Sequence, residues 1–237
     1  MSDQPGPRDE IALPDILPIF PLTGVLLLPR GRLPLNIFEP RYLAMTRDAL
    51  GGERLIGMVQ PSDPPKDHIG GGPGIAQGID NMNPPVYPIG CAGRITQFSE
   101  ADDGRYLITL TGVSRFRIRE ELPLLSGYRR VVPDWRPFAH DRDTPGKPEF
   151  DRERLIRGLK SYFAQRQIAA DFEAIGKAPG EYLVTSLAMA CPFAPSEKQA
   201  LLEAADPDER ARLLMTLVEM AAIEPTSEES SGGGTRH

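Results

Sequence analysis

The chain has 237 residues, of which 40% are hydrophobic and 25% charged, so it is long enough to bury one substantial core or two smaller ones. Its formal net charge of -6 argues against a general affinity for nucleic acid, which depends on clustered Lys and Arg. No apolar run approaches the roughly 18 residues that cross a bilayer, and the N-terminus lacks a secretory signal pattern, so we expect a cytoplasmic protein without membrane partners.

Residues 14–136 are predicted to form a β-rich part, after a disordered leader at residues 1–13. Pro40 ends one of its strands, and a helix is expected over about 41–50. Asp102, Asp103 and Gly104 supply the chemistry of a tight hairpin turn. Short apolar or alternating runs, bounded by breakers or turns, indicate strands at residues 16–22, 25–28, 33–38, 54–59, 89–98, 105–111, 113–119 and 128–135.

Residues 61–88 interrupt these strands with a stretch rich in Pro, Gly, Asn and Asp. A loop of this length is either a functional lid or a disordered insertion, and its few apolar anchors favour disorder. Within it, His68, Asp63 and Asp67 suggest a metal ion, but one imidazole and two carboxylates without regular spacing favour a solvated loop. We therefore predict no metal site.

The second half of the chain changes to a helical pattern. A polar linker at residues 137–148 precedes a helical part at residues 149–224, and residues 225–237 are expected to be a disordered tail. The helix signals are apolar stripes at 155–163 and 182–191, a capping box at Ser196 and Gln199, and an opening Asp206-Pro207 pair.

Several blocks of sequence occur together in a fixed order: 17–22, 37–42, 89–95, 103–106, 112–116 and 192–203. Together they resemble the N-terminal substrate-binding domain of Lon proteases, over roughly residues 14–222. The resemblance implies an α+β fold, with a PUA-like β pseudo-barrel followed by a helical bundle. It also implies a module that binds polypeptide in protein quality control.

The departures from the full Lon pattern concern catalysis. Lon carries an ATPase with a phosphate-binding loop and a peptidase with a Ser-Lys pair, and we expect neither within these 237 residues. No G-x-x-x-x-G-K-[ST] or G-x-S-x-G motif occurs. Cys91 and Cys191 show no ligand spacing and are expected to be free thiols. We therefore expect a stand-alone module without enzymatic activity, catalytic residues or cofactors.

The expected partner is unfolded or partly folded polypeptide, or alternatively a protease or chaperone. Such a module would use apolar side chains near the barrel mouth, with hydrogen bonding from a sheet edge to an extended peptide. The candidate contact residues are Phe38, Tyr42, Tyr87 and Phe98 for apolar contact, and Glu39 and Arg94 for polar anchoring. The oligomeric state does not follow from the sequence.

Glu39 and Arg41 flank the proline that ends the strand at 33–38. Such a turn can place a carboxylate-guanidinium pair that fixes a corner of the barrel, or it can present a carboxylate to a ligand. Because buried charges generally need partners, we favour the structural pair.

Arg115, Arg117 and Arg119 alternate with Phe116 and Ile118 and predict a basic stripe on one strand face. This stripe suggests the alternative function, a PUA-like RNA-binding protein. The overall acidity and the lack of interleaved aromatic residues favour a solvated face instead, so nucleic acid is an unlikely partner.

Overall fold

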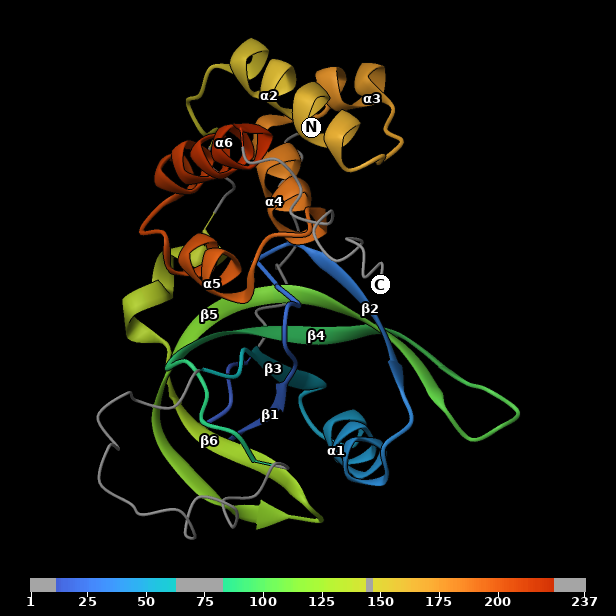
Figure 1. The fold of residues 1–237 in the computed structure, drawn as a ribbon. Coiled ribbons are helices and arrows are strands. Elements are labelled where there is room, and N and C mark those ends of the chain that lie inside the picture. The colour runs from blue at the N-terminus through green and yellow to red at the C-terminus, as the bar shows by residue number, and fades with distance from the viewer. Residues whose placement is uncertain (1–11, 63–82, 144–146, 224–237) are drawn as a thin grey trace, which may run out of the picture. The chain divides into compact units, whose positions relative to one another are not determined.

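The structure is a computed structural model that describes residues 12–62, 83–143 and 147–223 (Figure 1). It consists of two compact units. The first comprises the residues up to Thr23 together with Leu27–Asp143, and the second comprises Gly24–Leu26 together with the residues from 144 onward. The first unit holds the strands and the second holds most of the helices, so the predicted α+β class is confirmed.

The first unit is built on one six-stranded sheet in the order β2-β5-β4-β3-β1-β6. Because β6 also pairs with β5, strands β5, β4, β3, β1 and β6 close into a ring, and β2 is added to the outside of β5. Only β1 and β3 run parallel; the other pairs are antiparallel. The strands are β1 (Leu17–Pro21), β2 (Arg32–Ile37), β3 (Leu55–Val59), β4 (Ile89–Glu100), β5 (Tyr106–Leu125) and β6 (Tyr128–Asp134).

Strand β5 is the longest element and pairs with three others. Its first half lies between β2 and β4, and its second half pairs with β6. The sequence predicted two strands separated at Gly112, but the structure has one continuous strand. A side chain at Gly112 would overlap the carbonyl group of Leu28, so the glycine permits a close backbone approach and does not break the strand.

The predicted strand at 25–28 is wrong, since these residues join no ladder. Leu27 and Leu28 are nevertheless buried. A Cβ added to Gly93 would lie 2.6 Å from Leu27 Cδ2, which shows that Leu27 packs directly on β4. Leu27 is therefore apolar because it packs on the sheet, not because it lies in a strand.

The barrel interior is a cluster of apolar side chains from five strands. Phe116 packs at its centre, and Trp135 contacts it edge-on with ring centroids 5.7 Å apart. The buried members of this cluster are Leu17, Ile19, Leu55, Val59, Ala92, Phe116 and Val131.

Two further elements complete the first unit. Helix α1 (Pro40–Leu50) packs against the barrel, and its Asp48 accepts a hydrogen bond of 2.7 Å from Tyr128 of β6. The 3-10 helix η1 (Arg136–Arg142) occupies part of the predicted linker 137–148. The linker prediction therefore differs from the structure, because η1 is fastened to β5 by Arg115 and Asp141.

The second unit contains five helices within the described residues: α2 (Arg152–Gln165), α3 (Phe172–Lys177), α4 (Gly180–Ala190), α5 (Pro195–Glu203) and α6 (Pro207–Ile223). No helix in the described ranges is long and apolar enough to cross a membrane.

Side-chain caps explain where several of these helices begin. The Asp206 carboxylate accepts a hydrogen bond from the Glu209 N–H at 2.7 Å, as its predicted capping role requires. The predicted cap at Ser196 is wrong: α5 begins earlier, and Glu197 accepts a hydrogen bond from the Ala194 N–H at 2.7 Å. The ammonium group of Lys198 donates to the Gly24 carbonyl at 2.8 Å, which ties the 24–26 segment into this unit.

Candidate functional site

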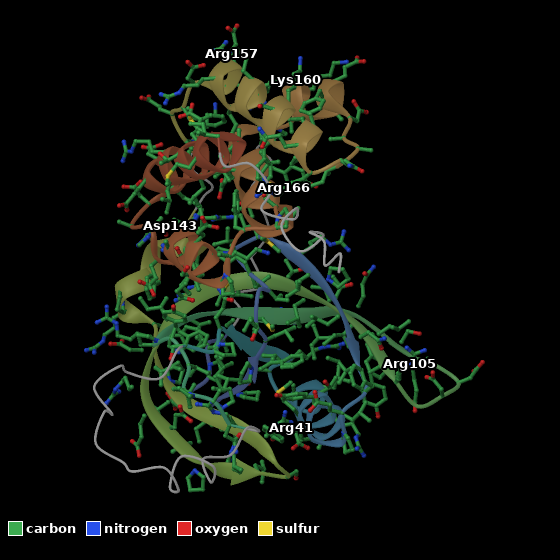
Figure 2. The ribbon with its side chains drawn as sticks, viewed as in Figure 1. Arg41, Arg105, Asp143, Arg157, Lys160 and Arg166 are labelled. Atoms are coloured by element: carbon green, nitrogen blue, oxygen red, sulfur yellow. The ribbon has the colours of Figure 1, made fainter. Side chains whose placement is uncertain are left out.

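Beyond the end of β3, strands β2, β5 and β4 continue as a three-stranded sheet that ends in the β4–β5 hairpin (Figure 1). Figure 2 labels Arg105 near the tip of this hairpin. The predicted turn is confirmed, with Gly104 at a φ of 80°. The Arg105 backbone N–H, together with its guanidinium, holds the pKa of the Asp103 carboxyl below its usual value. Asp103 is therefore engaged within the turn by Arg105.

A groove of about 550 Å³ lies on this three-stranded sheet. Its lining is regular, because three consecutive residues come from each of the three strands. They are Pro34, Leu35 and Asn36 of β2, Leu107, Ile108 and Thr109 of β5, and Gln97, Phe98 and Ser99 of β4. The cross-strand register places these residues side by side.

Polar groups dominate the face that Gln97 and Thr109 share. The Gln97 side-chain oxygen accepts a hydrogen bond of 2.8 Å from the Thr109 hydroxyl and a longer one, of 3.4 Å, from Arg32. Leu107 interrupts this polar surface, since it lies on the same face of β5 as Thr109 and is 48% exposed. The groove therefore offers hydrogen-bonding groups around an apolar contact.

Two of the predicted apolar contact residues lie at this end of the sheet. Phe98 lines the groove through its place in β4, while its ring packs on Tyr106 with centroids 5.1 Å apart and stays 41% exposed. Phe38 directly follows β2 and is 63% exposed. Exposed aromatic rings of this size are available for contact with a partner.

Arg94 lies on the face that continues into the groove. It is the cross-strand neighbour of Thr111 on one side and of the core residue Leu55 on the other. Cross-strand neighbours point to the same side of a sheet, so Arg94 stands between the barrel interior and the groove. The residue is half-buried.

Glu39 and Arg41 form the ion pair that the sequence favoured, with Glu39 Oε2 and Arg41 Nη2 3.0 Å apart. The Arg41 guanidinium also lies over the ring of Tyr42, 4.5 Å from its centroid. Tyr42 itself is buried against Phe20, and this burial raises the pKa of its hydroxyl. Figure 2 labels Arg41 at α1.

The six candidate residues are thus not brought together in one site. Tyr42 is buried and forms part of the corner, and Tyr87 lies elsewhere, where its N–H donates to the Gln60 carbonyl at 2.9 Å. Sequence reasoning also missed Leu107 and Asn36. Leu107 could have been found from the sequence, because residues 107, 109 and 111 share one strand face and Leu107 is the apolar residue beside two threonines.

The predicted basic stripe is wrong in its first member. Arg115 is buried in an ion pair with Asp141, while Arg117 and Arg119 are exposed. The alternating pattern predicted an exposed Arg115, but both faces of β5 are covered at this point. Ser114, Arg115 and Phe116 are all buried. The three arginines therefore form no continuous surface for RNA.

The group Asp63, Asp67 and His68, for which the sequence favoured a solvated loop over a metal site, lies outside the described residues. In the parts of the chain that the structure describes, no group of three or more His, Cys, Asp or Glu side chains is arranged to hold a metal ion.

Comparison with known proteins identifies the family. The family model of the ATP-dependent protease La (LON) substrate-binding domain matches residues 16–220. The chain belongs to this family. Two solved structures of Lon N-terminal domains show the same fold. One is a Lon N-terminal domain protein from Xanthomonas campestris, with a TM-score of 0.53, 23% identity, and coverage of 85% of this chain and 97% of that one. The other is the N-terminal domain of the Mycobacterium avium complex Lon protease, with a TM-score of 0.57, 15% identity, and coverage of 86% and 97%.

Curated relatives are Lon proteases. Lon protease 2 of Sorangium cellulosum is 28% identical over 211 residues, which cover 86% of this chain and 24% of that protein. Lon protease 2 of Myxococcus xanthus is 26% identical over 219 residues, which cover 90% of this chain and 24% of that protein. The chain thus spans about a quarter of the length of these relatives, the part that corresponds to the Lon substrate-binding domain.

Proposed function

We propose that this chain binds unfolded or partly folded polypeptide as a non-enzymatic module of protein quality control in the cytoplasm. Membership of the Lon substrate-binding domain family supports the binding of protein substrates. The proposal rests on the groove on the three-stranded sheet, which is where we expect the polypeptide to bind.

The chemistry of the groove suits an extended polypeptide. Asn36, Gln97 and Thr109 offer side-chain amides and a hydroxyl, which bind main-chain groups whatever the sequence of the client. Leu107 adds apolar contact in the groove, and the exposed Phe38 lies close by in sequence at the end of β2. An unfolded client exposes both main-chain hydrogen-bonding groups and apolar side chains.

The same lining argues for binding without catalysis. None of the nine residues around the groove is a histidine, a cysteine or a carboxylate. Nucleophilic and general acid-base catalysis need such groups within hydrogen-bonding reach of one another. The groove therefore has the groups of a binding surface.

Retention of a permanently unfolded protein, such as reduced and carboxymethylated lactalbumin, tests the proposal against folded lactalbumin. Leu107→Ser should weaken binding of the unfolded form several-fold. Leu124→Ser is the matched control, because Leu124 is 51% exposed but lies outside the groove, in the distal half of β5. Equal loss in both variants, or no preference for unfolded protein, would contradict the proposal.

A further inference from the structure

The three-stranded sheet that carries the groove has two edges. One is β2, which among the described strands pairs only with β5. The other is the distal part of β4, residues 96–100: β3 pairs with β4 only from Cys91 to Arg94, Gln97 to Glu100 pair with β5 alone, and Thr96 lies at the bulge. These five residues are all exposed. An edge of this kind presents unpaired N–H and C=O groups that can accept another strand.

The direction of these groups follows from the hairpin turn. The Ala101 N–H donates to the Arg105 carbonyl at 2.9 Å, and the Gly104 N–H donates to the Ala101 carbonyl at 2.9 Å. Ala101 is therefore bonded toward β5, and the antiparallel ladder alternates from that point. The backbone groups of Ser99 and Gln97 also point toward β5, whereas those of Glu100 and Phe98 point outward to the free edge.

The same alternation places the outward groups of β2 at Pro34 and Asn36. The register pairs Leu35 with Ile108 and Ile37 with Tyr106, whose backbone groups point away from β4 and toward β2. Pro34 has no N–H, so the middle of the β2 edge lacks a donor. Edge β2 is thus protected, while β4 has no proline from 96 to 100.

We infer that the β4 edge at Phe98 and Glu100 accepts an extended segment of client polypeptide as an added strand, with an apolar residue beside Phe98 and a basic residue two positions away beside Glu100. This inference rests on the proposed function and names the class of client segment. Phe98 and Glu100 are two residues apart, so their side chains share one face of β4, and so do the client residues beside them.

Charge complementarity supports the basic residue. Asp103 is engaged by Arg105 with 2.7 Å between the carboxylate and the guanidinium. Within the described residues, Glu100 and the neighbouring Asp102 form no such ion pair. The tip therefore carries an excess of negative charge next to the exposed ring of Phe98.

Two designed changes test strand addition without disturbing the hairpin. Glu100→Pro removes an N–H that the β4–β5 ladder does not use, and Glu100→Ala removes only the charge. The probes are two labelled peptides, one with phenylalanine two residues before lysine for a parallel strand and one with the reverse order for an antiparallel strand, with threonine elsewhere, measured by fluorescence anisotropy. We expect Glu100→Pro to weaken binding about tenfold, because the variant cannot donate the main-chain hydrogen bond from residue 100 to the added strand. Glu100→Ala should remove the preference for lysine over glutamate in the peptide.

Peptide isomers provide a second readout that does not depend on the variants folding. One isomer is N-methylated on one alternate set of amides and the other on the remaining set. An added strand directs only one set toward β4, so one isomer should bind like the parent and the other about tenfold more weakly. Equal binding of the two isomers would overturn the inference.

The proposed function and this inference can fail separately. If wild-type protein retains unfolded lactalbumin and Glu100→Pro retains it equally well, the edge assignment is wrong and the proposed function stands. If wild-type protein retains no unfolded lactalbumin, both are wrong. A concentration-dependent dimer that Glu100→Pro abolishes would assign the edge to a second copy of the chain and overturn the inference.

Discussion

Arg115 and Asp141 form a buried ion pair, with Nη2 and Oδ1 2.8 Å apart and side chains only 1% and 6% exposed. The Asp141 carboxylate also accepts hydrogen bonds of 2.9 Å from the Arg115 Nε and from the Arg115 backbone N–H. The guanidinium lies over the ring of Phe138, 4.6 Å from its centroid. This pair fastens η1 to the middle of β5.

Asp141→Ala should therefore strongly destabilise the first unit. Removing one partner leaves the other charge buried and uncompensated, which costs about 3–5 kcal/mol. Urea denaturation measures the loss. Asp134→Ala is the control, because its partner Arg136 is 85% exposed, so the change leaves no charge buried without a partner and should cost much less. Similar losses in the two variants would show that the buried pair has no special role.

Local patterns predicted most of the strands, the hairpin turn and α1. The errors arose where long-range packing decides the structure. Leu27 in the 25–28 run is apolar because it packs on β4, and the polar segment 137–143 is ordered because Asp141 pairs with Arg115 of a strand far away in sequence. Neither of these long-range contacts produces a periodic pattern in the sequence.

Gly112→Ala tests the close approach between β5 and the 25–28 segment. A Cβ at this position would overlap the Leu28 carbonyl, so backbone must move, and we expect a loss of about 3 kcal/mol or more. Gly51→Ala is the matched control, since the nearest atom to its new Cβ is 3.5 Å away. Thermal unfolding of the two variants decides the matter: an unchanged midpoint for Gly112→Ala would contradict the packing.

The candidate site was predictable only in part. The sequence indicated the hairpin, Phe98 and Phe38. The groove itself depends on the register of three strands and on a bulge between Ile95 and Gln97, which turns Gln97 toward Thr109. Bulges and register are set by pairing across the sheet, so the neighbourhood of Leu107, Asn36 and Gln97 was not visible in the sequence.

Tyr162→Phe should make the protein less sensitive to alkaline pH. Tyr162 is buried, its hydroxyl has no hydrogen-bond partner among the described residues, and burial raises its pKa to about 12. Because the folded pKa exceeds the unfolded value of 10.0, its contribution to stability is complete below pH 10 and is lost as the pH rises toward 12. The variant should be as stable at pH 7, or about 1 kcal/mol more stable.

Tyr128→Phe provides the contrast for this experiment. Its hydroxyl also has a pKa raised to about 12, chiefly by burial, but it donates to Asp48. Removing it should cost about 1–2 kcal/mol at pH 7. Urea denaturation at pH 7 and pH 11 separates the two variants, and equal losses at pH 7 would refute the distinction.

Glu39→Gln distinguishes the two interpretations of the charged turn before α1. If Glu39 serves the corner through Arg41, the variant should lose less than about 1 kcal/mol of stability, because the carboxylate is half-exposed, and should bind unfolded lactalbumin as the wild type does. Leu107→Ser should behave in the opposite way, with stability kept and binding weakened. Retention assays and urea denaturation on both variants measure the two effects. Loss of binding in Glu39→Gln with unchanged stability would instead assign the carboxylate to the ligand and extend the binding surface from the groove onto α1.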